Sequence, residues 1–469
     1  MNFHAHWRAE LRATVLLALP IVFGQAGQML MGLTDSVIVG RLGPVPLAAV
    51  AFANTALTTL MVFGIGLLTS IGVVGSREHG AGNLNGRARI LRAAFWLSVS
   101  LGTCLAIAIN ALQGCLGDWF HPPADVFEAA QPYLSVTGWS LLPAIGYFGA
   151  KIFCESLNCP LAPMWFLFGG VMLNLILASA LVFGWFGFPA LGLVGSGWAT
   201  AISRWFTFAA TTWYACSLTG ESWRRTLLPA GLDQGLLGQL LRLGAPVAFQ
   251  YLGEVAAFNF GAVMMGWIGT IALAAHQIAI SCAALTFMFP LGVSQAVAVR
   301  IGHAVGGRAL RRVPVIGFTG IGLSAALMLA FAGILGFGRH AIALAFNADP
   351  AVVSLAGRLL LIAALFQLAD GVQVTAAGVL RGLADVRAPM LLGYLFYWVV
   401  AIPLASLIAF HFGQGASGIW IGLATGLLLA AVTLTGRAFA LTRPGSLSVR
   451  AYQAGTAGPE DRARNSAPV

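Results

Sequence analysis

The sequence predicts an all-α polytopic membrane protein with twelve transmembrane helices in two six-helix lobes, related by a pseudo-twofold axis along the membrane normal. Three observations lead to this fold. Of the 469 residues, 59% are hydrophobic and only 9% are charged, whereas a soluble domain carries about 25% charged residues. The apolar residues gather in runs of roughly 20 to 30, and about 20 suffice for a membrane-spanning helix. The two halves of the chain also match one another at a fixed offset.

Each apolar run lies between charged loops and is interpreted as one transmembrane helix. The alternating segments of about ten residues that a transmembrane β-barrel needs do not occur in the sequence. In chain order the helices are expected at residues 13–39, 46–75, 93–116, 131–150, 161–186, 189–215, 243–267, 271–299, 313–337, 359–380, 388–410 and 415–436.

The basic residues predict that both termini are cytoplasmic. With the N-terminus inside, the 25 Lys and Arg residues fall in cytoplasmic loops and tails, Lys151 included, apart from Arg41, Arg204, Arg339 and Arg358. This is the bias of the positive-inside rule. The net charge of +10 therefore reflects membrane topology and does not indicate nucleic-acid binding.

The two halves align without gaps at an offset of 226, so that Pro20 meets Pro246 and "ESLNCPLAPM" (155–164) meets "RGLADVRAPM" (381–390). An even number of helices per repeat gives both lobes the same orientation. In transporters built from such repeats the substrate site lies near the midplane between the lobes, which rock to alternate access. Pro20 and Pro246 are either static kinks or hinges. The expected parts are a cytoplasmic N-terminus (1–12), an N-terminal lobe (13–225), a C-terminal lobe (226–440) and a disordered cytoplasmic tail (441–469).

Three acidic residues lie inside predicted spans, where a carboxylate costs roughly 2.5–3.5 kcal/mol on insertion scales. Glu254 and Asp370 lie near the midplane of the seventh and tenth helices, and Asp35 lies in the outer third of the first. Such groups bind a proton, Na⁺ or a cationic substrate, unless each is a protonated carboxyl bonded to a neighbouring helix. Arg204 either neutralises Asp35 or extends to the interface as a snorkelling side chain.

Other polar side chains inside the spans are candidates to complete these sites, and hydrogen bonding between helices is the alternative role for each. Those expected near Asp35 are Gln28, Asn54, Asn174 and Thr200, and those near Glu254 are Gln250, Asn259 and Gln277. The sequence contains no HExxH, GxSxG or phosphate-loop motif, so we expect neither an enzyme nor a cofactor.

Four stretches carry a resemblance to a known family: "MGLTDSVIVGRLGPVPLAAVAF", "FQYLGEVAAFNFGAVMMGWIGTIALAAHQIA", "FPLGVSQAVAVRIGHAVG" and "FQLADGVQVTAAGVLRGLADVRAPM". From about residue 12 to 440 the chain resembles the multidrug and toxic compound extrusion (MATE) transporters, in their NorM-like branch. The resemblance implies a bacterial inner-membrane antiporter, expected to be monomeric. It would export cationic drugs and dyes as Na⁺ or H⁺ enters.

The resemblance also implies roles for individual residues. Asp35, with Asn174 and Thr200, would form the cation or substrate site of the N-terminal lobe, and Glu254 and Asp370 that of the C-terminal lobe. Some relatives have a second aspartate four residues beyond the asparagine, where this chain has Ala178. That difference moves the expected Na⁺ site to Glu254 and Asp370 and leaves proton coupling at Asp35 open.

A lipid-linked oligosaccharide flippase of the same wider superfamily is the alternative function. Such proteins line their cavity with several cationic residues to hold pyrophosphate. Three intramembrane acids against one intramembrane arginine, Arg204, favour a cationic cargo.

Overall fold

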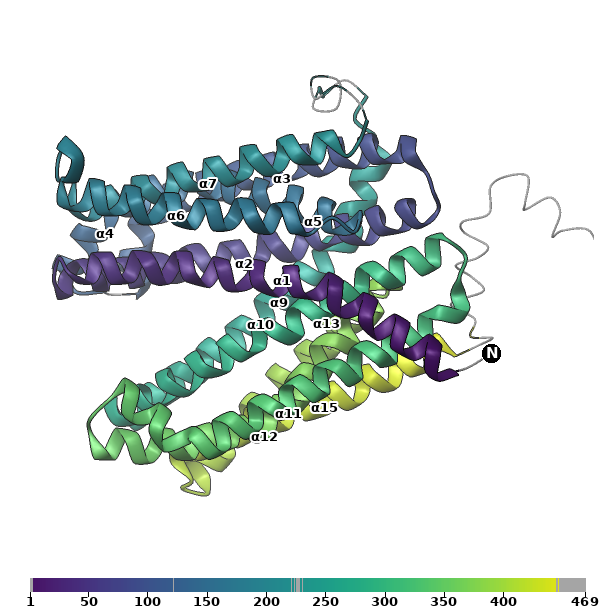
Figure 1. Cartoon of the computed structure of the whole chain (residues 1–469). Coiled ribbons are helices and arrows are strands. Elements are labelled where there is room, and N and C mark those ends of the chain that lie inside the picture. The colour runs from purple at the N-terminus through teal and green to yellow at the C-terminus, as the bar shows by residue number, and fades with distance from the viewer. Residues whose placement is uncertain are drawn as a thin grey trace, which may run out of the picture.

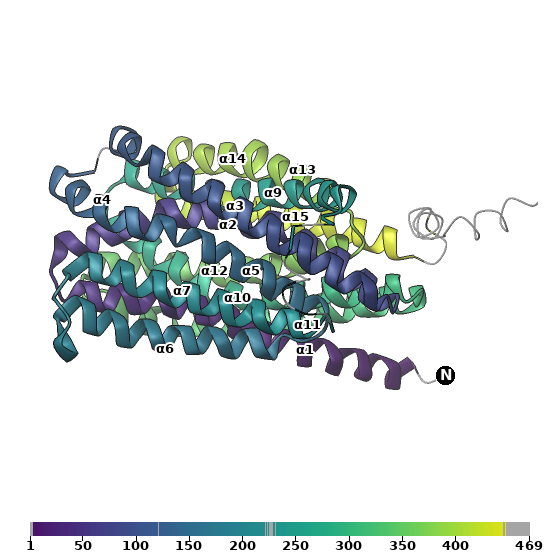
Figure 2. The same ribbon diagram turned by 90° about the horizontal axis from the view of Figure 1, so that it is seen from above.

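The computed structural model describes residues 3–120, 122–220, 222, 224, 228–229, 231–443 and 446. Within these residues the chain is helical and forms two lobes, which meet at one end and diverge toward the other (Figure 1). The axes of the long helices are roughly aligned with one another (Figure 2). We call the end where α1 begins and α15 ends the basic end, after Arg77, Arg300 and Arg381 near its helix termini. The opposite end is the far end.

The N-terminal lobe (N-lobe) is built from the helices of the first repeat. They are α1 (Phe3–Gly40), α2 (Pro44–Gly80), α3 (Leu84–Phe120), α4 (Ala124–Trp139), α5 (Leu141–Ser156), α6 (Leu161–Phe183), the 3₁₀ turn η1 (Trp185–Gly187) and α7 (Gly192–Ser217).

The C-terminal lobe (C-lobe) is built from the second repeat. Its elements are α9 (Gln234–Ile268), α10 (Thr270–Gly306), η2 (Leu310–Arg312), α11 (Val313–Phe346), α12 (Pro350–Gly382), α13 (Arg387–Tyr394), η3 (Leu395–Ala401), α14 (Ile402–Ser406), η4 (Leu407–His411) and α15 (Gly415–Thr442). Here η3 and η4 are π-helical turns, so α13 to η4 form one uneven membrane-spanning unit.

All twelve predicted spans overlap these helices. By length and hydropathy alone, nine helices of the described chain qualify as membrane spans, and α7 and α9 are not among them. The predicted span 131–150 is also not among them, because it divides at Ser140 into α4 and α5, of 16 residues each. Pro143 has no N–H to give the carbonyl of Trp139, and this missing bond explains the break. The two pieces together make one spanning unit.

The ends of the chain differ from the expectation. The segment 1–12 is not a separate terminus, because α1 is already helical from Phe3. At the other end α15 continues to Thr442, so the predicted tail begins inside a helix. The rest of that tail, apart from Ser446, lies outside the described residues, and so does the predicted lobe boundary at 225/226.

The duplication is confirmed at the level of single residues. Helices α2 and α10 both have 37 residues, and their first residues, Pro44 and Thr270, are 226 positions apart. The left-handed non-glycine residues Asn158 (φ 64°) and Ala384 (φ 61°) are separated by the same 226 positions. The backbone therefore repeats at these equivalent positions, as a pseudo-twofold axis between the lobes requires.

The lobes touch along α2 and α10 at glycines that allow the backbones to approach closely. A Cβ atom on Gly66 would lie 2.6 Å from Cα of Ala248, and one on Gly292 would lie 3.2 Å from Cα of Val22. These two contacts are equivalent under the offset of 226. Gly302 packs directly on Ser76, its own counterpart, so the pseudo-twofold axis passes close to this pair.

Two hydrogen bonds join the lobes at the basic end, again as a symmetric pair. Arg77 Nη2 of α2 donates to the carbonyl of Gly382 at the end of α12, at 3.0 Å. His303 Nε2 of α10 donates to the carbonyl of Ser156 at the end of α5, at 2.7 Å. Each lobe thus provides a donor to the free carbonyl groups at a helix C-terminus of the other lobe.

The first helix of each repeat contributes to the core of the opposite lobe. Leu17 and Ile21 of α1 are buried in a cluster formed otherwise by residues of α10, α11, α12 and α15. In the same way Leu236 and Leu240 of α9 are buried in the main core of the N-lobe. The later part of α1, around Ile38, packs on α6 and α7 of its own lobe. The two first helices therefore cross over between the lobes.

Candidate functional site

The N-lobe carboxylate is Asp35, which α1 carries into contact with α6 and α7. Thr200 Oγ1 donates to Asp35 Oδ2 at 2.8 Å, and Asn174 Nδ2 donates to Oδ1 at 3.2 Å. Ser196 Oγ approaches Oδ1 at 3.4 Å, and Asn174 also donates to Thr200 Oγ1 at 3.1 Å. Only 4% of Asp35 is exposed. The predicted trio of Asp35, Asn174 and Thr200 is therefore brought together.

Neutral groups surround this carboxylate. In the described part of the chain no basic side chain forms an ion pair with Asp35, and Arg204 instead donates to Ser140 Oγ at 2.7 Å. The side-chain amide oxygen of Asn174, Oδ1, is buried and accepts no hydrogen bond from any described residue. A buried carboxylate beside an unpartnered acceptor is suited to take up a proton or a cation.

The C-lobe carboxylates lie on α9 and α12. Glu254 Oε1 accepts two amide hydrogen bonds, from Gln250 Nε2 at 3.0 Å and from Gln373 Nε2 at 3.2 Å. Asp370 is buried one helical turn before Gln373 and makes no hydrogen bond or ion pair with any other described residue. Tyr397 of η3 donates to Gln373 Oε1 at 3.0 Å.

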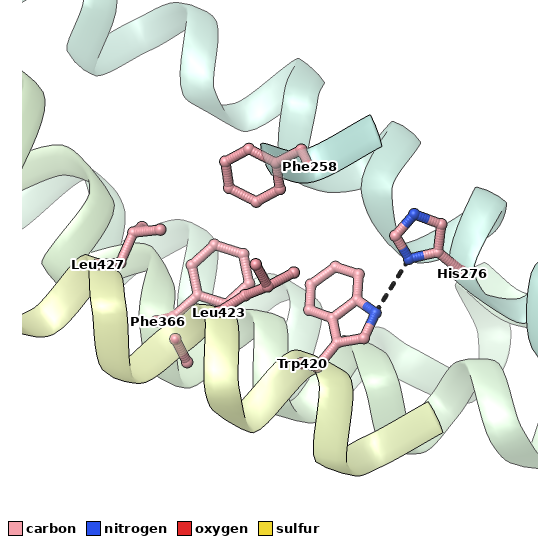
Figure 3. A pocket seen from close by; sticks show the side chains of 7 residues that line it. Phe258, His276, Phe366, Trp420, Leu423 and Leu427 are labelled. Atoms are coloured by element: carbon pink, nitrogen blue, oxygen red, sulfur yellow. Dashed lines mark hydrogen bonds between the residues drawn. The ribbon is translucent and has the colours of Figure 1, made fainter. Parts of the chain in front are cut away.

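An apolar pocket lies one turn from these carboxylates on both α9 and α12. Phe258 is four residues after Glu254, and Phe366 is four residues before Asp370, so each shares a helix face with its carboxylate. Figure 3 shows Phe258, Phe366 and Trp420 around the pocket, with the Trp420 indole N–H donating to His276 Nδ1 at 3.1 Å.

The other predicted polar residues separate into two groups. Gln250 reaches Glu254, as expected. Asn259 and Gln277 are exposed on their helices, and Gln28 and Asn54 are half-buried. None of these four hydrogen-bonds to a carboxylate within the described residues.

Sequence reasoning missed three residues of these sites, although a signal was present for two of them. Ser196 lies four residues before Thr200 and Gln373 three residues after Asp370, which are the spacings of neighbours on one helix face. Tyr397 carried no such signal, because the π-helical turn that directs it inward is not visible in an apolar sequence.

The prediction that Lys151 lies in a cytoplasmic loop is wrong. Lys151 is a buried residue of α5 and forms an ion pair of 2.7 Å with Glu155, one turn later. The short α5 that follows the break at Ser140 extends the helix past the predicted end of the fourth span. Arg204 is consequently not the sole basic residue within the helices. Arg300 of α10 is also buried, where it pairs with Glu10 of α1.

Comparison with known proteins places these features in a family. The family model MatE matches residues 20–179 and 246–407, once in each repeat. A protein of Bradyrhizobium diazoefficiens named "Probable multidrug resistance protein NorM" is 35% identical over 448 residues, covering 93% of this chain and 95% of that protein. A protein of the same name in Mesorhizobium japonicum is 37% identical over 441 residues, covering 92% of this chain and 94% of that protein.

Solved structures share the fold at low sequence identity. The Vibrio cholerae MATE transporter VcmN in its bent form superposes with a TM-score of 0.84 at 19% identity, covering 96% of this chain and 99% of that one. The eukaryotic MATE transporter AtDTX14 gives 0.83 at 18% identity, with the same coverage. From the match in both repeats and the similarity to NorM proteins over nearly the whole length, the chain belongs to the MATE family, in its NorM branch.

Proposed function

We propose that the protein is a secondary active multidrug efflux transporter of the bacterial inner membrane. It exports cationic lipophilic drugs and dyes in exchange for Na⁺ or H⁺. The observation that carries this proposal is a set of three carboxylates inside the helices, the buried Asp35 and Asp370 and the half-buried Glu254, none of which forms an ion pair with a basic side chain of the described residues. Carboxylates buried in a membrane without a counter-ion mark ion or substrate sites. The names of the NorM relatives support drugs as the cargo.

In the N-lobe the chemistry favours a proton. Asp35 has three hydroxyl or amide donors and no other carboxylate among its hydrogen-bond partners. Ala178, one turn beyond Asn174, lies in an apolar cluster with Ile38. A Na⁺ ion would find a single carboxylate here, beside the neutral oxygens of Asn174, Ser196 and Thr200, whereas the C-lobe offers two carboxylates. Protonation of Asp35 removes the charge that a cationic drug would need.

In the C-lobe two carboxylates are available. Glu254 and Asp370 together carry four carboxylate oxygens, of which Glu254 Oε1 already accepts from the amide nitrogens of Gln250 and Gln373. We assign Na⁺ to this pair. The described residues contain no group of three or more His, Cys, Asp or Glu side chains placed to hold a metal, so the ion would rely on these two acids and neutral oxygens. Ion and drug then compete for the same negative charge.

Transport requires the lobes to rock. We assign the basic end, with both termini, to the cytoplasm, because basic residues concentrate there. Contact between the lobes at this end supports an outward-open state. The inward-open state would need those contacts to separate, with the lobes 13–225 and 226–440 moving as units and α1 and α9 bending at Pro20 and Pro246. Coupling requires the two states to differ in cation affinity, because equal affinity shifts no equilibrium.

The contacts of the basic side chains within the helices disfavour the flippase alternative. Lys151 is paired with Glu155 and Arg300 with Glu10. Arg204 is bonded to Ser140 and Arg381 to Tyr251. A pyrophosphate group would have to compete with these partners for every one of those charges. We also propose that the monomer is the transporting unit, because each chain contains both carboxylate sites.

The test is ethidium export from efflux-deficient cells, driven separately by an inward Na⁺ gradient and by an inward proton gradient. Asp35→Asn, Glu254→Gln and Asp370→Asn are compared with the parent. The matched control is Glu128→Gln, which removes an exposed carboxylate of α4 outside both sites.

Loss of Na⁺-driven export in the Glu254 and Asp370 variants would support the C-lobe ion site. Export that only a proton gradient drives, and that only Asp35→Asn abolishes, would move coupling to the N-lobe. If neither gradient drives export of any cationic dye, the efflux proposal is wrong.

A further inference from the structure

The π-helical turn η3 and the residue before it bring three aromatic side chains with polar tips against α9 and α12. Tyr394 Oη donates to the carbonyl of Phe249 at 3.1 Å, and Trp398 Nε1 donates to the carbonyl of Gly253 at 3.1 Å. Both acceptors are main-chain atoms of α9, within five residues of Glu254. The third donor, Tyr397, hydrogen-bonds to the side chain of Gln373 of α12. π-Helical turns inside α-helices occur frequently at functional sites.

The hydroxyl of Tyr397 holds the amide of Gln373 in place on the side away from Glu254. Tyr397 Oη donates to Gln373 Oε1 at 3.0 Å, and the amide nitrogen donates to the carboxylate of Glu254 at 3.2 Å. In the reverse orientation Oε1 would face Glu254, and two acceptors would repel one another. An ionised Glu254 therefore fixes the orientation of the amide, and Tyr397 fixes its position.

Both hydrogen bonds from amide groups to Glu254 are accepted by the same carboxylate oxygen. Gln250 and Gln373 both donate to Oε1, and Oε2 accepts no hydrogen bond from any described residue. One oxygen is thereby fixed and the other is left with its lone pairs free. This is the arrangement a carboxylate needs to bind a cation in a defined position.

We propose that Tyr397 is a positioning residue for cation binding, which acts through Gln373 to hold Glu254 with Oε2 open to the ion. This inference rests on the proposed C-lobe cation site and adds a residue that sets its affinity. Tyr397 is 2% exposed and Gln373 is 3% exposed. Water therefore does not replace a hydrogen bond that is lost here. Hydrogen bonds in such a buried series also polarise, and so strengthen, one another.

The decisive variant is Tyr397→Phe, which removes only the phenolic oxygen. Its matched control is Tyr394→Phe, which removes the same atom three residues earlier in the same segment, where the bond goes to the main chain of α9. Ethidium export from preloaded, efflux-deficient cells is measured against external Na⁺ concentration at fixed pH, and against external pH without Na⁺. The readout is the half-saturating concentration of the driving cation, kept separate from the maximal rate.

We expect Tyr397→Phe to raise the half-saturating concentration about 3- to 10-fold, the loss of one buried hydrogen bond, with the maximal rate retained. Tyr394→Phe should change it less than twofold. Gln373→Leu should produce at least the same increase. Because Tyr397 acts only through Gln373, adding Tyr397→Phe to Gln373→Leu should have no further effect, which a double-mutant cycle detects.

Glu254→Gln separates failure of this inference from failure of the site itself. If Glu254→Gln abolishes cation dependence while Tyr397→Phe behaves like Tyr394→Phe, the positioning role is wrong and the cation site stands. Additive effects of the Tyr397 and Gln373 changes would also overturn the positioning role. If Glu254→Gln leaves the half-saturating concentration unchanged, both the site and the role assigned to Tyr397 are wrong.

Discussion

Replacing Gly306 by alanine should separate the lobes at the basic end. An ideal Cβ atom on Gly306 would lie 2.0 Å from the carbonyl oxygen of Arg77 and 2.9 Å from its Cα. These are main-chain atoms of the other lobe, so no side-chain rotation relieves the contact. Ordinary van der Waals contact begins at about 3.4 Å, so α2 must retreat by about 1.4 Å, the difference between 3.4 and 2.0 Å.

The Gly306→Ala substitution costs free energy only in the conformation in which the basic end is closed. Overpacking of this kind costs about 1–3 kcal/mol. In a state with the basic end open, Gly306 and Arg77 are apart and the cost disappears. The equilibrium between the two states should therefore shift by roughly 5- to 150-fold toward the open basic end. Gly80→Ala, the change at the equivalent position of the first repeat, should have the same effect, because its Cβ atom would lie 2.3 Å from the carbonyl oxygen of His303.

Electron spin–spin distance measurements would detect this shift. Spin labels replace Leu84 and Arg311, two exposed residues at the basic end of opposite lobes, in a protein whose six cysteines are substituted. We expect a longer distance to gain population in Gly306→Ala. Gly322→Ala serves as the control, since a Cβ atom there meets nothing within 4 Å. A folded Gly306→Ala protein with the parent's distance distribution would refute the reasoning, as would an equal shift in Gly322→Ala.

Thr200→Val removes the 2.8 Å hydrogen bond that stabilises the charged carboxylate of Asp35. A bond to a charged group contributes about 1.5–3 kcal/mol, so Asp35 should bind a proton more tightly. Proton-driven dye export should then be half-saturated at an at least about tenfold lower proton concentration, and Thr200→Ser should restore the parent's value. Lys151→Met leaves Glu155 charged and unpaired in the core, which should cost about 3–5 kcal/mol and lower the thermal unfolding midpoint in detergent. Adding Glu155→Met should recover most of that loss, and a double variant no more stable than the single one would contradict the ion-pair argument. Trp420→Phe removes a buried indole donor and should cost about 1–3 kcal/mol in the same assay, whereas an unchanged midpoint would show that its bond to the histidine of α10 contributes nothing.

The helices and the duplication were predictable because both depend on local and repeated features. Apolar runs long enough for a membrane determine where helices lie, and several glycines, with Pro20 and Pro246, match between the repeats at one fixed offset. The trio around Asp35 was predictable through the family resemblance. Of the C-lobe site, only Glu254, Asp370 and Gln250 were predictable.

What escaped prediction depends on contacts between helices. Lys151 appeared to belong to a loop, since a single lysine near a helix end is usually solvated, and only the approach of Glu155 one turn later explains its burial. Tyr397 depends on a π-helical turn, whose extra residue per turn leaves no mark in an apolar sequence. Glu10 looked like part of a solvated terminus, yet it accepts from Arg312 Nε at 2.7 Å and also pairs with Arg300.

The crossing of α1 and α9 has a consequence for biogenesis. When the first repeat has been synthesised, its core still lacks Leu236 and Leu240, which arrive only with α9. The second repeat in turn cannot complete its core without Leu17 and Ile21 of α1. Each half therefore completes part of its core with residues of the other half. The helices of the first repeat are therefore incompletely packed in the membrane until α9 is inserted beside them.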